Sequence, residues 1–104
     1  MQFNQVENPR GYSVPIAGNK WIFAPLPLGA VERFQDALNS GNVPISAVID
    51  MGHISLKRNY PEITRDYVAE ELIDMANMQE VLSTITQVSG LEYTGNTEEQ
   101  ASGE

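Results

Sequence analysis

The apolar positions of the chain follow a short period near the N-terminus and a helical period afterwards. Residues 12–16 and 21–24 alternate between core-facing and polar positions, which predicts two short strands. Gly18 and Asn19 lie between them and can adopt the positive φ angles of a tight turn. Because Pro15 cannot donate to a ladder, we expect its strand to lie at an edge. Two strands alone are only marginally stable, so the hairpin must pack on helices.

Two helices are predicted in the next part of the chain. The first begins near Pro27, whose missing N–H suits a first helical turn, and it ends at residues 39–42. The apolar stripe of this helix comprises Leu28, Val31, Phe34 and Leu38. The second helix covers residues 44–59, since Pro61 disfavours helical geometry at Tyr60. The stripe of the second helix comprises Ile45, Val48, Ile49, Gly52, Leu56 and Tyr60.

Two further helices follow. Thr64 is the predicted N-cap of the third helix, whose stripe comprises Val68, Leu72 and Met75. Asn77 and Glu80 have the spacing of a capping box and open the fourth helix. The stripe of the fourth helix comprises Met78, Val81, Leu82, Ile85 and Val88. Gly90, as a left-handed C′ residue, ends this helix, and Leu91 can fold back toward Ile85.

These elements predict a mainly α, small α+β protein with a short N-terminal β-hairpin packed on about four helices. The chain has 104 residues, which is enough for one domain with a modest core, and we place that domain at residues 1–91. Residues 92–104 are mostly polar and acidic, so they cannot bury enough surface to offset the entropy lost on ordering. We expect this segment to be a disordered acidic tail.

Charge is distributed unevenly along the chain. Residues 1–65 carry six basic and five acidic side chains, whereas residues 66–104 carry nine acidic and no basic side chains, which together give the net charge of -8. Such an acidic half would repel nucleic acid. No cysteine is present, which permits a reducing compartment, and no apolar run approaches the roughly 20 residues that span a bilayer. We therefore expect an intracellular protein that binds neither nucleic acid nor membrane.

His53 is the one histidine of the chain and is a candidate for catalysis or metal binding. Asp50, His53 and Lys57 are spaced so that their side chains could meet on one helix flank. One alternative is thus a small hydrolase or metal protein centred on Asp50 and His53. Against it, there is no Gly-x-Ser-x-Gly elbow, and these two residues supply only two of the roughly three or four ligands that a metal needs. We expect neither enzyme activity nor a cofactor.

Four apolar residues are candidates for contact with a protein partner. Met51, Met75 and Met78 lie on predicted helices, and thioethers are over-used on adaptable binding surfaces. Trp21 lies in the predicted edge hairpin, where it could anchor a partner. Each residue also has a structural interpretation, because methionine fills gaps in cores and the tryptophan could pack on a helix.

One family resemblance bears on function. Residues 21–32, with the sequence WIFAPLPLGAVE, resemble the strand, Pro-Leu corner and first helix of small tail assembly chaperones of long-tailed bacteriophages and prophages. Residues 56–64 and 72–78, followed by residues 88–90, resemble the second half of the same group. The likeness covers residues 12–91, and its motifs are structural ones.

The resemblance implies a mostly helical, non-enzymatic protein in the cytoplasm of a bacterial host. Such proteins bind the long helical tape measure protein, keep it soluble and help tail-tube subunits polymerise around it. In that family a longer, frameshifted form often carries an extension that recruits the tube subunit, and the segment after Leu91 would suit such a junction. Pro27 departs from the family pattern, because a capping Ser or Thr is more usual there.

Other assignments stay open at this stage. A phage head or connector accessory protein, retained in the virion, would have the same size and acidity. The residues also leave open whether the chain forms a homo-oligomer and whether it contacts the tail tube protein itself.

Overall fold

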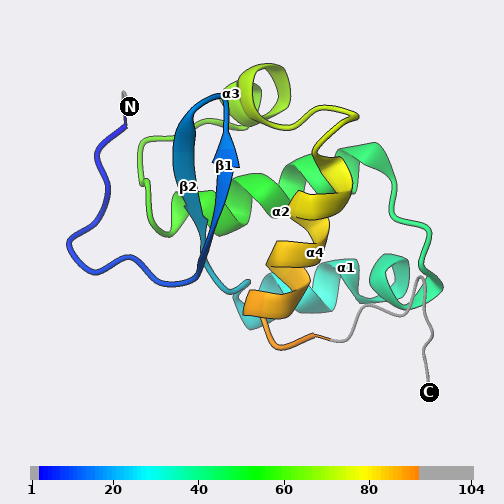
Figure 1. The fold of residues 1–104 in the computed structure, drawn as a ribbon. Coiled ribbons are helices and arrows are strands. Elements are labelled where there is room, and N and C mark those ends of the chain that lie inside the picture. The colour runs from blue at the N-terminus through cyan, green and yellow to red at the C-terminus, as the bar shows by residue number, and fades with distance from the viewer. Residues whose placement is uncertain (1–2, 92–104) are drawn as a thin grey trace.

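The computed structural model describes residues 3–91, which form a two-stranded hairpin followed by helices (Figure 1). The elements in chain order are β1 (Tyr12–Ile16), β2 (Asn19–Phe23), α1 (Leu28–Ser40), α2 (Ile45–Lys57), α3 (Arg65–Tyr67), the π-helical segment η1 (Val68–Leu72) and α4 (Met78–Val88). The hairpin packs on both α2 and α4. The predicted class, a small mainly helical α+β fold with an N-terminal hairpin, is confirmed. The predicted disordered tail, residues 92–104, lies outside the described residues.

The hairpin turn is one residue earlier than predicted. β1 and β2 pair antiparallel, with Ile16 opposite Asn19. The two residues between them, Ala17 and Gly18, have φ angles of 51° and 84°. Positive φ at both central positions matches the twist of the flanking strands. Asn19 and Lys20 therefore begin β2 and do not belong to the turn.

The C-terminal end of α2 covers the edge of β2. The Ile22 N–H donates to Tyr60 Oη at 3.0 Å, and the Ile22 carbonyl accepts from Asn59 Nδ2 at 2.8 Å. Asn59 also accepts from the Arg10 N–H at 3.1 Å and donates to the Arg10 carbonyl at 2.8 Å. Only 2% of Asn59 is exposed, so these bonds are shielded from water. One side chain thus joins the N-terminal segment, β2 and the end of α2.

The corner between β2 and α1 is held by two serine side chains. Ser55, which is buried on α2, donates from Oγ to the Ala24 carbonyl at 2.7 Å. Ser89, just after α4, accepts from the Leu26 N–H at 2.9 Å through its Oγ. Backbone groups that the proline-rich corner cannot pair internally thereby find partners. The start of α1 is positioned by α2 and by the end of α4.

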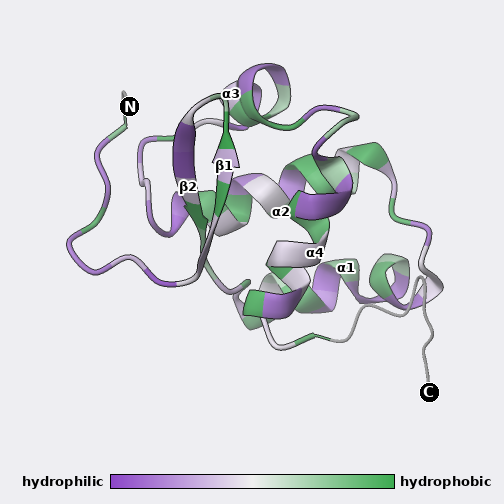
Figure 2. Cartoon of the chain, viewed as in Figure 1, coloured by the Kyte–Doolittle hydropathy of each residue, from purple (hydrophilic) through white to green (hydrophobic). Residues whose placement is uncertain are grey.

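The core lies where the hairpin meets α2 and α4. Its largest fully buried side chains include Trp21, Phe23, Met51, Leu56, Tyr60 and Ile85. The ring of Trp21 meets Tyr60 edge-on, with centroids 5.1 Å apart, and lies 6.4 Å from Phe3. Figure 2 shows hydrophobic and hydrophilic residues alternating along α1 and α4, as expected for helices buried on one face.

One predicted stripe residue in each of the first two helices is exposed. Leu28 is 86% exposed and Ile45 is 59% exposed. Each is the first residue of its helix, since Pro27 and Pro44 are N-caps in extended conformation. The periodicity identified both helices correctly. It could not show that the first residue of each helix extends beyond the core.

The third predicted helix is short, and it changes from an α-helix to a π-helix. Thr64 caps it as predicted, because its Oγ1 accepts from the Tyr67 N–H at 3.1 Å. The chain then continues as η1, in which the Ile73 N–H bonds the Val68 carbonyl, five residues back, at 3.0 Å. Ile73 is extended, so the helix ends before Met75. The prediction that Met75 belongs to a buried stripe is wrong.

The predicted capping box at Asn77 and Glu80 is also wrong. Asn77 precedes α4 but makes no side-chain cap bond to it. Its Oδ1 instead accepts from the Asp74 N–H at 3.0 Å, and its Nδ2 donates to the Leu72 carbonyl at 2.8 Å. Asp74 Oδ1 accepts from the N–H groups of Ala76 and Asn77, both at 2.9 Å. These two side chains fix the turn between η1 and α4.

The end of α4 is as predicted. Gly90 has a φ of 75°. The Leu91 N–H donates to the Thr86 carbonyl at 2.8 Å, and the Gly90 N–H donates to the Gln87 carbonyl at 3.1 Å. This is the 6→1 and 5→2 pattern of a Schellman motif. Leu91 packs against the core cluster.

Gly90→Ala should destabilise the protein by about 1 kcal/mol, because an L side chain is disfavoured at this φ. The cost is conformational, since a Cβ at Gly90 would meet no atom within 4 Å. Denaturant unfolding measures it. Gly29→Ala in α1, which also has nothing within 4 Å, is the matched control and should be neutral or stabilising by about 0.5 kcal/mol. The same sign at both positions would contradict the interpretation.

Asn59→Ala should destabilise by about 3 kcal/mol, because it leaves part-buried backbone groups of Ile22 and Arg10 without their partners. The measurement is again the free energy of unfolding. Asn42→Ala, at an exposed position after α1, should change it by less than about 0.5 kcal/mol. A small effect at Asn59 would show that water replaces its bonds.

Candidate functional site

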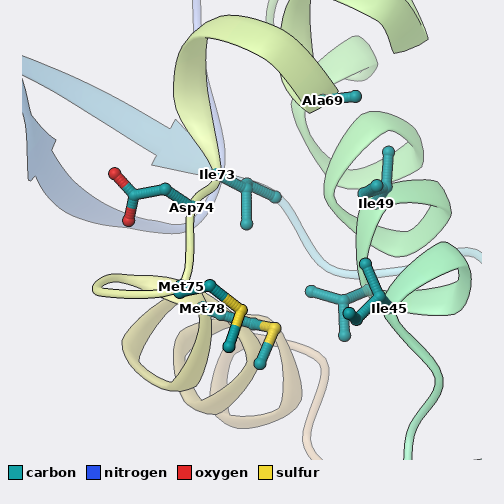
Figure 3. Close-up of a pocket in the computed structure, with 8 residues that line it drawn as sticks. Ile45, Ile49, Ala69, Ile73, Asp74, Met75 and Met78 are labelled. Atoms are coloured by element: carbon teal, nitrogen blue, oxygen red, sulfur yellow. The ribbon is translucent and has the colours of Figure 1, made fainter.

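An apolar groove lies between the start of α2, η1 and the start of α4, and its volume is about 180 Å³ (Figure 3). The lining residues are Ile45, Val48, Ile49, Ala69, Ile73, Asp74, Met75 and Met78. They come from three elements that are separate in sequence. The groove is therefore a product of the tertiary fold.

Isoleucines and methionines form opposite walls of the groove. Ile45 and Ile49 lie one turn apart on α2. Met75 and Met78 lie on the other side, in the turn before α4 and at its first residue, and Figure 3 shows them facing Ile45 across the gap. Met75 is 76% exposed and Ile45 is exposed as well. Water thus contacts apolar side chains on both walls.

Gly52 sets the depth of the groove. It is buried on α2, and a Cβ at this position would lie 2.7 Å from Cδ1 of Ile73. The missing side chain allows the end of η1 to approach α2 closely. Ile73 therefore packs over α2, where it lines the groove.

The wall that carries Met75 is held by the polar bonds of the preceding turn. Asp74 and Asn77 bond each other's backbone segment, as described above, on either side of Met75. In Figure 3 the carboxylate of Asp74 points away from the methionines and from Ile45. The acid therefore lies at the rim of the groove, and the centre of the groove is apolar.

The four predicted partner-contacting residues fall into two groups. Met75 and Met78 line the groove. Trp21 and Met51 are buried in the core, where the tryptophan ring packs on Tyr60. The core-packing interpretation holds for these two residues, so neither forms part of an accessible surface in this fold.

The isoleucines of the groove were not among the predicted contact residues. Ile45 and Ile49 were assigned to a core-facing stripe, and Ile73 was assigned no role. One signal was present in the sequence, because Pro44 places Ile45 at the first helical position, where a side chain can extend past the core. Ile73 lines the groove because it packs against Gly52, which is distant in sequence, so neighbouring residues alone could not predict its position.

Asp50 and His53 have different partners. Asp50 forms a salt bridge with Arg65. His53 Nε2 lies 3.2 Å from the Ile63 carbonyl oxygen. Within residues 3–91, no group of three or more His, Cys, Asp or Glu side chains is arranged to hold a metal ion.

Comparisons of this chain with protein-family models, curated proteins and solved structures give no match. In the part of the chain that the structure describes, no helix combines the length and apolar character needed to cross a membrane. The groove and the sequence resemblance are therefore the observations that bear on function.

Gly52→Ala should displace the side chain of Ile73 into the groove without unfolding the protein. The added Cβ conflicts only with the mobile end of Ile73, and alanine gains helix propensity, so the free energy of unfolding should change by about 1 kcal/mol or less. Methyl NMR should show shifts at Ile73, Ile45 and Ile49 and none at Ile16 in the hairpin. Shifts at every isoleucine would show that the substitution disturbs the whole core.

Proposed function

We propose that this protein is a phage or prophage tail assembly chaperone that binds an amphipathic helix of the tape measure protein in the groove between α2, η1 and α4. In this proposal it keeps its client soluble in the bacterial cytoplasm and assists tail-tube polymerisation. The observation that carries the proposal is the pair of exposed apolar walls, with Ile45 on one side and Met75 on the other.

The dimensions of the groove favour side chains of a protein over a small molecule. Its volume of about 180 Å³ is well below the roughly 300–1,000 Å³ of ordinary ligand pockets. An amphipathic helix presents apolar side chains at successive turns and can place a few of them in such a groove. Full burial of one large apolar side chain contributes about 1.5–3 kcal/mol, so Ile45 and Met75 together could supply a substantial part of the binding free energy.

The composition of the walls suits a client with a varied sequence. Methionine side chains are unbranched and polarizable, so Met75 and Met78 can adapt to different apolar partners. Promiscuous binding surfaces commonly use such flexible residues. A chaperone that contacts many places along one long helical client needs this tolerance.

The proposed activity is binding alone, at a near-equimolar ratio and without ATP, metal or turnover. Asp50 and His53 are engaged with Arg65 and the Ile63 carbonyl, which supports a structural role for both. The competing hydrolase or metal protein predicts that His53→Ala abolishes activity. The chaperone predicts that this variant still solubilises the client.

Co-expression of the tape measure gene with this protein should raise the amount of soluble client, measured by fractionation and blotting. Ile45→Ser with Met75→Ser should remove most of that increase, because both substitutions place polar groups on the groove walls. Leu28→Ser with Tyr12→Ser is the matched control. These residues are also exposed, at 86% and 55%, but neither lines the groove.

Equal amounts of soluble tape measure protein with and without this chain would disprove the chaperone function. Full activity of the groove variant would show that the client binds to another surface, while the chaperone function would stand. Absence of the protein from mature particles distinguishes an assembly chaperone from a head or connector protein.

A further inference from the structure

We infer that the groove selects helices whose apolar stripe is flanked by lysine or arginine side chains. This inference rests on the proposed function and specifies the client chemistry of the same groove. Its basis is the charge around the apolar walls.

Four acidic residues lie on the segments that form the groove. Glu70 directly follows the lining residue Ala69, and Glu71 is next on η1. Asp74 lies at the rim, and Glu80 is in the first turn of α4. All four residues are exposed. In Figure 2 the hydrophilic start of α4 lies beside the hydrophobic start of α2.

The chain itself does not neutralise these carboxylates. No lysine or arginine follows Arg65 in the sequence, and Arg65 is paired with Asp50. Among the described residues that is the one salt bridge, so it includes none of the four acidic groups at the groove. Their negative charge is available to a bound partner.

A helix with basic flanks complements both parts of this surface. Its apolar stripe would cover Ile45, Met75 and Met78. Lysine or arginine stems can run along apolar surface while their charged ends extend toward the carboxylates of η1 and α4. Each such exposed pair is worth about a 1.5- to 5-fold change in affinity, so three of them should discriminate about tenfold between basic and acidic flanks.

The same charge argues against other occupants. A second copy of this chain bound groove to groove would bring two acidic rims together, because a two-fold interface places the same patch on both sides. Nucleic acid would be repelled by the same carboxylates. A basic amphipathic helix from a different protein is the occupant that the surface favours.

The test uses the full chain and two synthetic helical peptides of about 20 residues, long enough to form helix. Both carry the same leucine stripe, flanked by lysine in one peptide and by glutamate in the other. Calorimetry or fluorescence anisotropy at low salt should give about tenfold tighter binding of the lysine peptide. The preference should shrink as salt rises past about 0.15 M, where the Debye length is about 8 Å.

Charge-neutralising variants locate the effect. One triple variant combines Glu70→Gln, Glu71→Gln and Glu80→Gln. Its affinities for the lysine and glutamate peptides should differ by no more than about twofold, while both peptides still bind through their leucine stripe. Asp74 is left unchanged because it holds the turn that carries Met75. The matched control, Glu7→Gln with Glu32→Gln and Asp36→Asn, removes the same charge from exposed positions outside the groove lining and should keep the full preference.

Three results would overturn the inference. Equal affinity for the two peptides would reject charge selection and leave the chaperone function standing. If the control triple variant also lost its preference for the lysine peptide, the preference would come from the net charge of the protein and not from Glu70, Glu71 and Glu80. Binding of neither peptide would reject helix docking in the groove, whereas the co-expression experiment separately decides whether the protein solubilises its client.

Discussion

The fold depends on how the C-terminal end of α2 completes the edge of a two-stranded hairpin. Such a hairpin is marginal by itself, and its outer edge carries backbone groups that need partners. Asn59 and Tyr60 provide them for Ile22, and Asn59 also holds the backbone of Arg10. Because the Asn59 and Tyr60 side chains are buried, α2, β2 and the N-terminal segment are expected to be stabilised together.

The position of the groove follows from this anchor. The end of α2 beside the hairpin is buried at Leu56, whereas the first residue of the helix, Ile45, is exposed. Gly52, between the two ends, allows Ile73 and the end of η1 to approach. The turn that follows then places Met75 opposite Ile45. The bond network thus lies at one end of α2 and the apolar groove at the other.

Local sequence chemistry determined two of the helix ends. Thr64 supplies a side-chain oxygen to a helix N-terminus, and Gly90 adopts the left-handed conformation that ends α4. The asymmetry of charge was also evident, since every residue after Arg65 is neutral or acidic. These features involve only a few neighbouring residues or simple composition, so they can be predicted without knowing which segments meet.

Tertiary packing decided which apolar residues are accessible. Met51 and Met75 both lie on predicted helices, yet Met51 is buried in the core and Met75 is exposed. Asn77 had the spacing of a cap, but its side chain bonds the Asp74 N–H and the Leu72 carbonyl instead. The sequence by itself determined the order of the elements and some of their ends, such as the Thr64 cap and the Gly90 stop. Long-range contacts alone decided which faces they bury and where the groove forms, since burial depends on neighbours distant in the chain.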